Sequence, residues 1–129
     1  MIFFDRSVPR GIVDALKYVR DDVRWLEDEF PHATPDPVWL REVGNRGWLV
    51  ITRDKKIRSR PGEQRALLEN SVGCFCLTQG RDPTRWQYLK LIVGTHDEML
   101  ERFERTPRPF LYGVGRTGKF TLILPRATT

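Results

Sequence analysis

Acidic side chains recur in the first half of the chain, just after short apolar runs or at an expected helix start. The candidates for a chemical role are Asp5, Glu27, Asp28, Asp36 and Asp54. Asp5 directly follows the apolar run at 2–4, and Asp54 comes two residues after the run at 48–52. The carboxyl ends of parallel strands share one edge of a sheet, where open α/β folds bind their ligands. We therefore expect these acids to converge at one sheet edge.

Converging carboxylates repel one another, and a bound cation offsets that repulsion. Aspartate and glutamate oxygens suit Mg²⁺ or Mn²⁺, whereas Zn²⁺ favours histidine and cysteine ligands. Such an ion activates water and stabilises the negative charge that develops on a phosphoryl group. The sequence predicts a Mg²⁺ or Mn²⁺ ion held by Asp5, Asp36 and Asp54, with Asp28 or Glu27 as a further acid of the site.

Basic side chains flank the expected acid site. They are Arg6, Lys55, Lys56, Arg58 and Arg60. We interpret them as groups that hold a phosphate backbone against acids that would otherwise repel it. The whole chain carries 22 basic and 17 acidic residues, with a formal net charge of +5 and a pI near 9.6. This balance favours an anionic partner.

Each acid also has a simpler interpretation. Asp36 could serve only as the cap of the helix that follows it. Glu27 and Asp28 belong to the run EDE, which is typical of a solvated surface. Asp54 could pair with a neighbouring basic residue in a surface ion pair worth about 0 to 1 kcal/mol. Asp5 is the hardest to explain in this way, because it follows a strand that is expected to be buried on both faces.

Apolar runs alternate with helical periodicity, which indicates an α/β fold with a mostly parallel central sheet and helices on both faces. Strands are expected at 2–4, 23–26, 48–52 and 72–77, and helices at about 8–19, 37–44, 64–69 and 84–105. The tail at 109–125 alternates around the glycine-rich segment 115–118. It predicts a C-terminal β-hairpin with Arg116 and Lys119 at its tip.

The length of 129 residues is expected to form one domain. No apolar run approaches the roughly 20 residues that a membrane-spanning helix needs. The first residues also lack the cationic start and longer apolar stretch of a signal peptide. We therefore expect a cytoplasmic protein without a membrane partner.

Other side chains with reactive chemistry have ordinary roles available. Cys74 and Cys76 lie two apart in an expected strand, which suits buried thiols better than a disulfide or a metal site. His32 belongs to a proline-rich loop and is expected to be exposed. Glu63 stands at a helix start, where it could cap the helix, pair with Arg65 or make an outer contact to the acid site.

The long helix expected at 84–105 carries further candidates. Arg85, Trp86 and Tyr88 could stack on nucleic-acid bases, although aromatic residues at this spacing are more often part of a core. Gly94 is expected to divide the helix, with His96 at the break.

Two segments of the chain, FFDRSVPR and TPDPVWLREVGNRGWLVITRDKKI, resemble the PIN-like ribonuclease domains, in particular the short VapC-like branch of bacterial toxin–antitoxin systems. The resemblance covers about residues 2–78 and leaves out 81–129. It implies a parallel sheet between helices, an acid cluster that binds Mg²⁺ or Mn²⁺, and cleavage of RNA. The acids that match the family's site are Asp5, Asp36 and Asp54, with Glu27 or Asp28 near the place of a further one.

The leading hypothesis is therefore a metal-dependent endoribonuclease that acts as the toxin of a toxin–antitoxin pair. It implies RNA as the substrate, an antitoxin protein as a partner, and a second copy of the chain as a candidate partner. The main alternative is a non-catalytic nucleic-acid-binding domain of the same fold, which predicts salt-sensitive RNA binding without cleavage. A phosphoacceptor or phosphatase domain, which also places acids at strand ends, is the third hypothesis.

Overall fold

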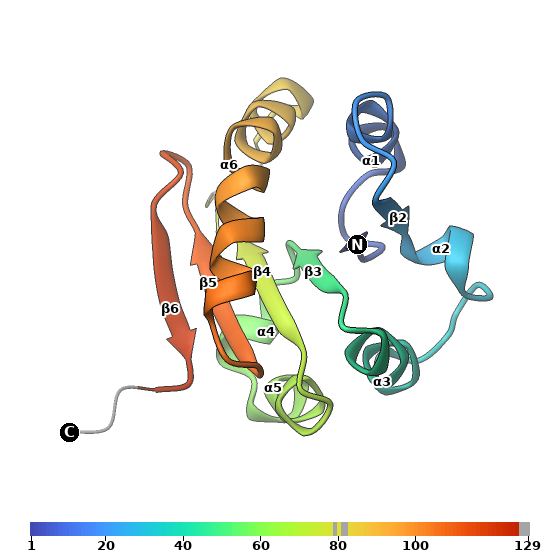
Figure 1. Ribbon diagram of the computed structural model, residues 1–129, viewed down its shortest axis with the longest axis vertical. Helices are drawn as coiled ribbons and strands as arrows, with labels where there is room; N and C mark the ends of the chain where they lie inside the picture. Colours follow the sequence, from blue (N-terminus) through green and yellow to red (C-terminus); the bar gives the residue numbers. More distant parts are fainter. Residues whose placement is uncertain (79, 81–82, 127–129) are drawn as a thin grey trace.

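A six-stranded sheet runs through the centre of the molecule in this computed structural model, which describes residues 1–78, 80 and 83–126. The strands are β1 (Ile2–Phe4), β2 (Val23–Trp25), β3 (Leu49–Thr52), β4 (Gly73–Leu77), β5 (Phe110–Val114) and β6 (Phe120–Leu124). Their order in the sheet is β2-β1-β3-β4-β5-β6 (Figure 1). The first five strands are parallel, and β6 is antiparallel to β5. The predicted mostly parallel α/β sheet with a C-terminal hairpin is confirmed.

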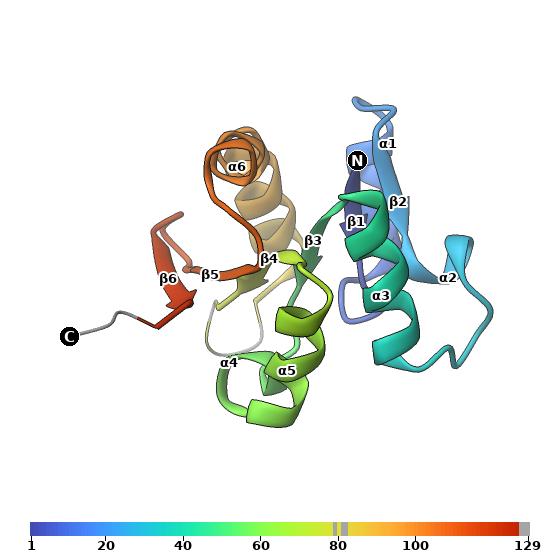
Figure 2. The same ribbon diagram turned by 60° about the horizontal axis from the view of Figure 1, so that its bottom comes forward.

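Helices cover both faces of the sheet (Figure 2). They are α1 (Arg10–Lys17), α2 (Leu26–Glu29), α3 (Asp36–Arg46), α4 (Lys56–Ser59), α5 (Pro61–Glu69) and α6 (Arg85–Arg105). One core cluster joins α1 and α6 to the sheet, and a second joins α3, α4 and α5 to the opposite face. In the described part of the chain, no helix has both the length and the apolar character needed to cross a bilayer.

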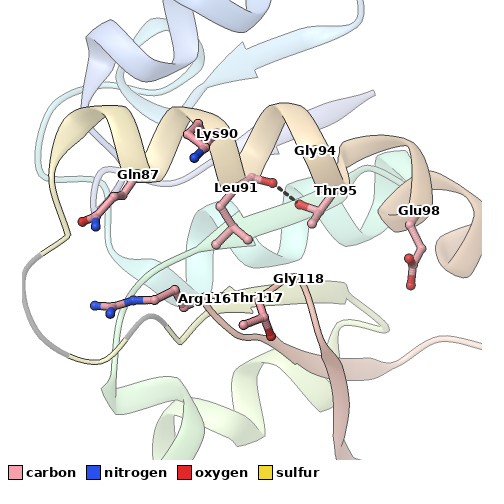
Figure 3. A pocket seen from close by; sticks show the side chains of 9 residues that line it. All are labelled: Gln87, Lys90, Leu91, Gly94, Thr95, Glu98, Arg116, Thr117 and Gly118. Atoms are coloured by element: carbon pink, nitrogen blue, oxygen red, sulfur yellow. Dashed lines mark hydrogen bonds between the residues drawn. The ribbon is translucent and has the colours of Figure 1, made fainter.

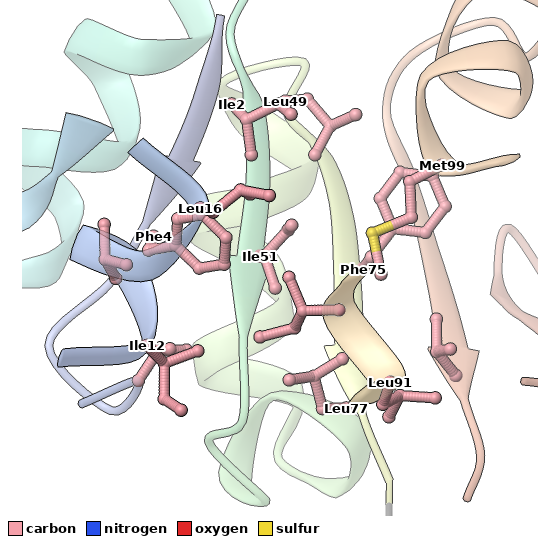
Figure 4. Packing of buried hydrophobic residues seen from close by; sticks show 14 of the residues in the cluster. Ile2, Phe4, Ile12, Leu16, Leu49, Ile51, Phe75, Leu77, Leu91 and Met99 are labelled. Carbon is pink, nitrogen blue, oxygen red and sulfur yellow. The ribbon is translucent and has the colours of Figure 1, made fainter. Parts of the chain in front are cut away.

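The strands β1, β3 and β4 consist of buried residues throughout, because both of their faces are covered. Alternate side chains of a strand point to opposite faces. Phe4 and Ile51 thus join the core beneath α1 and α6, which Figure 4 shows from close by. Phe3 and Val50 join the core beneath α3, α4 and α5.

The order of the strands creates a crevice between β1 and β3. The chain leaves β1 through α1 to reach β2, and it then returns through α3 on the opposite face to reach β3. Because the crossovers beside β1 lie on opposite faces, the carboxyl ends of β1 and β3 are the place where such a sheet binds ligands. Asp5 and Asp54 follow these two strands.

The last long helix, α6, is continuous, so its predicted division at Gly94 is wrong. His96 likewise lies inside the helix rather than at a break. Buried side chains continue on both sides of the glycine, among them Leu91, Thr95 and Met99. Their packing outweighs the penalty of about 1 kcal/mol for one glycine in a helix.

Two short helices were not expected from the sequence. The strand expected at 23–26 ends at Trp25, and the next four residues form α2. The basic segment after β3 contains α4, which buries Ile57. The first helix is also shorter than the expected 8–19, since Val19 lies beyond its end and is 69% exposed.

Gly44 allows α3 and α5 to lie close together. A Cβ atom at this position would come within 2.1 Å of the backbone oxygen of Asn70, the residue that ends α5. The side-chain amide of Asn70 also donates a hydrogen bond to the carbonyl oxygen of Ala66 at 2.7 Å. The backbone at Asn70 is therefore fixed, and it leaves no room for a side chain on Gly44.

We expect Gly44→Ala to destabilise the protein by about 1–3 kcal/mol, because the added methyl group forces α3 away from α5. Gly94→Ala is the matched control, since a Cβ atom at Gly94 would have no atom within 4 Å. This control should instead stabilise the protein by up to about 1 kcal/mol through helix propensity. Urea unfolding of both variants measures the difference, and equal stability of the two would contradict the packing argument.

Candidate active site

The carboxyl group of Asp5 lies at the end of β1 and is 8% exposed. Its Oδ1 atom accepts hydrogen bonds from the backbone nitrogen of Ser7, at 3.0 Å, and from the Ser7 hydroxyl. Its Oδ2 atom accepts a hydrogen bond from the Thr52 hydroxyl at 2.6 Å. Both oxygens are therefore oriented by neighbouring groups.

Burial raises the pKa of Asp5 to about 6, because the charged form loses its hydration. The hydrogen bonds from Ser7 and Thr52 lower this pKa in part, and the nearby negative charge of Asp54 raises it slightly. Asp5 is thus mainly ionised at neutral pH, at a cost that an adjacent positive charge would relieve.

Two hydroxyl groups tie the residues after β1 to those after β3. The Thr52 hydroxyl, which donates to Asp5, also accepts a hydrogen bond from the backbone nitrogen of Asp54 at 3.1 Å. The Ser7 hydroxyl accepts one from the backbone nitrogen of Arg53 at 2.9 Å. Neither hydroxyl was predicted from the sequence to belong to the site. Their spacing in the sequence could have indicated this role, since Ser7 lies two residues after Asp5 and Thr52 lies two residues before Asp54.

Four carboxylates line one small pocket beside this network. They belong to Asp5, Asp36, Asp54 and Glu63. The remaining wall is largely apolar and includes Trp39 and Ile57. The space inside is about 20 Å³, which is room for about one water molecule. The pocket therefore suits a single small occupant surrounded by oxygen atoms.

Asp36 and Asp54 are each held through one oxygen. Oδ1 of Asp36 accepts a hydrogen bond from the indole nitrogen of Trp39 at 2.9 Å, and Oδ1 of Asp54 accepts one from the backbone nitrogen of Lys56 at 3.0 Å. In the described residues, the second oxygen of each has no hydrogen-bond partner. Asp36 is the first residue of α3, and the cap position belongs to Pro35, so the capping interpretation of Asp36 is wrong.

Neither Glu27 nor Asp28 lines the pocket, so the structure does not bring either of them together with the other predicted acids. Asp28 forms ion pairs with Arg10 at 2.5 Å and Lys17 at 3.1 Å, both on α1. Glu27 lies 3.3 Å from the Nδ1 atom of His32, whose side chain is exposed as expected. The fourth carboxylate of the pocket is Glu63, at the start of α5.

The five basic residues predicted near the site differ in their exposure to solvent and in their hydrogen bonds. Lys55, Lys56 and Arg60 are exposed. Arg58 is partly buried, and its Nε atom has no hydrogen-bond partner among the described residues. Arg6 donates a hydrogen bond to the carbonyl oxygen of Thr34 at 3.0 Å and so holds the proline-rich loop. Phosphate binding by these five residues stays a prediction.

The two cysteines are free and buried, as expected for packing residues. Cys74 forms part of the pocket wall. Burial raises the pKa of Cys74, and it raises the pKa of the Cys76 thiol to about 12. Neither thiol is therefore ionised at neutral pH, and neither has the reactivity of a thiolate.

The donor atoms of the pocket fit a hard divalent cation, since all four acids offer carboxylate oxygens. Within the described residues, however, no three acidic, histidine or cysteine side chains lie close enough together to hold a metal ion. Coordination by three of these carboxylates requires their side chains to move towards one another. The pocket thus contains Asp5, Asp36 and Asp54, their present spacing is wider than a bound ion would need, and metal binding stays a prediction.

A family model described as a PIN-like domain matches residues 1–79. The chain belongs to the PIN-like domain family. The matched span contains all four pocket acids, including Glu63. No curated protein and no solved structure gives a significant match.

PIN-like domains are generally nucleases, so the fold is of a nuclease type. The PIN-like part of the predicted resemblance is confirmed, and the VapC-like branch stays a prediction. Residues 80–129 of the PIN-like protein lie outside the match. Of the region 81–129, residues 81–82 and 127–129 are outside the described residues, and the remainder contains α6, β5 and β6 with the segments that connect them.

The raised pKa of Asp5 predicts how stability depends on pH in the absence of divalent ions. Between the ordinary aspartate pKa near 4 and the folded value of about 6, the folded state binds more protons than the unfolded state. Stability should therefore fall as the pH rises through this window, by an amount on the order of 3 kcal/mol. Asp5→Asn should lack this loss and should be more stable than the wild type at pH 7.

Unfolding by urea in EDTA between pH 4 and pH 8 measures this difference. Asp28→Asn is a suitable control, because Asp28 lies outside the pocket in ion pairs with α1. Parallel pH curves for the wild type and Asp5→Asn would show that Asp5 is not the group responsible.

Proposed function

We propose that this PIN-like protein is a Mg²⁺- or Mn²⁺-dependent endoribonuclease that hydrolyses RNA phosphodiester bonds. The observation that carries the proposal is the set of four carboxylates around one small pocket at the carboxyl ends of β1 and β3. Membership of a family of generally nuclease function supports it.

Asp5, Asp36 and Asp54 would hold the ion, and Glu63 is the fourth acid available to it. The ion supplies an activated water and positive charge against the scissile phosphate. Asp5 is the central ligand, because Thr52 and Ser7 already orient its oxygens. The second oxygens of Asp36 and Asp54, which have no hydrogen-bond partner among the described residues, would be available to the ion.

The walls and rim of the pocket serve the same chemistry. The buried side chains of Trp39 and Ile57 keep bulk water away from the acids, which strengthens electrostatic interactions inside the pocket. Arg58, Lys55 and Lys56 follow Asp54 directly in the chain and offer positive charge to the phosphates that flank the cleaved bond.

A specific observation also supports the non-catalytic alternative. The acids are spaced more widely than a bound ion would need in the described residues. A protein that kept this spacing would bind RNA through its basic residues in a salt-sensitive manner and would not cleave it. The phosphoacceptor hypothesis is weaker, because the residue that follows Asp5 is Arg6 rather than a second acid, and because it gives the basic residues after Asp54 no clear role.

The biological setting follows from the resemblance to the VapC-like branch. We propose that the protein is the toxin of a toxin–antitoxin pair, with a cognate antitoxin and a second copy of the chain as candidate partners. Growth arrest on induced expression, and its relief by Asp5→Asn, is the observation that would support this role.

Cleavage of RNA tests the proposed activity. The purified protein is incubated with total cellular RNA in MgCl₂, MnCl₂ or EDTA, and new RNA ends are mapped by sequencing. We expect cleavage only with a divalent ion, and a loss of at least about 100-fold in Asp5→Asn, since even groups that only support metal ligands contribute 10- to 100-fold. Glu63→Gln should also reduce cleavage.

Asp28→Asn tests whether an acid that was predicted from the sequence, but does not line the pocket, contributes to cleavage. This variant should cleave RNA at the wild-type rate. Full activity of Asp5→Asn would contradict the assignment of the pocket. Binding of RNA without any cleavage in either ion would favour the non-catalytic alternative.

A further inference from the structure

A second cleft lies between α6 and the turn that joins β5 to β6 (Figure 3). Its volume is about 500 Å³, far larger than the acid pocket. One wall is formed by the first half of α6, and the other by the turn residues 116–118. All of these residues lie outside the span that matches the PIN-like family.

The cleft carries positive charge on both walls. Lys90 of α6 and Arg116 of the turn both line the cleft. In the described residues, neither forms an ion pair. Among the described residues of the lining, the one acid is Glu98, and Arg102 already engages it, with 2.7 Å between Oε2 and Nε. The uncompensated charge of the cleft is therefore positive, which suits a phosphate group.

Two glycines shape the cleft. Gly118 has a φ of +82°, and a Cβ atom built on it would lie 3.5 Å from Cγ2 of Thr95, so the turn rests directly on α6. Gly94 lines the cleft, and a Cβ atom there would meet no atom within 4 Å. Packing thus does not require a glycine at position 94, although glycine weakens a helix. Its effect is to leave the cleft open.

The cleft and the acid pocket lie at the same edge of the sheet. The turn after β5 follows the carboxyl end of a strand that runs parallel to β1 and β3, and α6 likewise begins after the carboxyl end of β4. Arg53, the neighbour of Asp54, lies over the ring of Tyr88 on α6, with 4.7 Å from Cζ to the ring centroid. The surface between the two sites therefore contains a further cation.

An aromatic side chain of α6 lies next to Lys90, and it lines a neighbouring pocket between α1 and α6 rather than the cleft itself. Trp86 is 65% exposed, whereas Tyr88 is buried, so only Trp86 departs from the expected core role. The Nζ atom of Lys90 lies 5.9 Å from the centroid of the Trp86 ring. A positive groove next to an exposed aromatic ring is the combination that binds single-stranded nucleic acid.

We propose that this cleft binds the backbone of a single-stranded RNA segment that flanks the cleavage site, with Trp86 stacking on a base. The identity of the ligand rests on the proposed nuclease function. Lys90 and Arg116 contact phosphates, and the open space at Gly94 admits the backbone. The part of the chain outside the family match thus contributes to substrate binding.

Binding is measured without cleavage, by fluorescence anisotropy of a fluorescein-labelled 12-nucleotide single-stranded RNA in EDTA, with Asp5→Asn as the parent protein. The double substitution Lys90→Ala/Arg116→Ala should weaken binding about tenfold at 0.15 M salt, because each phosphate contact on a single strand contributes about 0.7 to the slope of log K against log salt. The slope itself should fall by about 1.4. Trp86→Ala should weaken binding at least about fivefold.

Two further variants keep the test independent of folding and of total charge. Gly94→Gln fills the cleft, adds no charge and improves helix propensity, so it should weaken RNA binding while raising the melting temperature. Arg105→Ala removes one positive charge from the far end of α6, outside the cleft, and should bind within about twofold of the parent.

The proposal is overturned if the parent binds no single-stranded RNA, or if the double variant and Gly94→Gln both bind within twofold of the parent. Equal competition by polyphosphate of the same charge would reduce the cleft to a general anion site and would also overturn it. Because the readout is binding, a protein that fails to cleave RNA but loses affinity in these variants would refute the proposed activity and leave the cleft assignment standing.

Discussion

The burial of one carboxyl group between β1 and β3 governs the arrangement of the candidate site. Asp5 ends a strand whose faces are both covered, so its charge is removed from water. Hydrogen bonds from Thr52 and Ser7 compensate this loss only in part, and the pKa of Asp5 remains raised to about 6. The same hydroxyls bind the backbone of Arg53 and Asp54, and they fix the end of β1 to the end of β3. The burial of Asp5 and its hydrogen bonds to Ser7 and Thr52 thus fix the crevice between β1 and β3, and they also leave a carboxylate that a positive charge would stabilise.

The sequence was sufficient for the features that depend on local pattern. Continuous apolar runs predict parallel strands with two covered faces, and an acid after such a run must lie at the ligand-binding edge of the sheet. It was insufficient where packing selects among similar residues. Glu63 and Asp28 are both acids near a helix start, and the sequence does not distinguish them. In the structure, Glu63 at the start of α5 lines the pocket. Asp28 instead forms ion pairs with Arg10 and Lys17 of α1. The continuity of α6 across Gly94 likewise depends on the sheet that the helix covers, which local propensity does not contain.

The chain beyond the PIN-like match extends the same sheet. β5 pairs in parallel with β4, and β6 closes the edge in the antiparallel direction, so that the hairpin turn returns to the carboxyl edge where the acids lie. The helix α6 crosses the face shared with α1 and places its first turns at this edge as well. Under the proposed function, the small acid pocket would carry the chemistry at one phosphate, and the larger basic cleft would bind the neighbouring phosphates. The acids of the pocket come from strand ends and helix starts, whereas the polar groups of the cleft come from within α6 and from the turn after β5.

The central claim is that the carboxylates around Asp5 hold a divalent ion, and thermal unfolding of the wild type and Asp5→Asn in a series of MnCl₂ concentrations tests it most directly. An ion that binds only the folded state stabilises it by about 2.7 kcal/mol at 100 times its dissociation constant. The account predicts that the wild-type midpoint rises with Mn²⁺ concentration at pH 7.5, that the stabilisation falls to about 0.4 kcal/mol when the ion is diluted to its dissociation constant, and that the midpoint of Asp5→Asn stays constant. A midpoint that is insensitive to millimolar Mn²⁺ in the wild type, or an equal rise in both proteins, would contradict it.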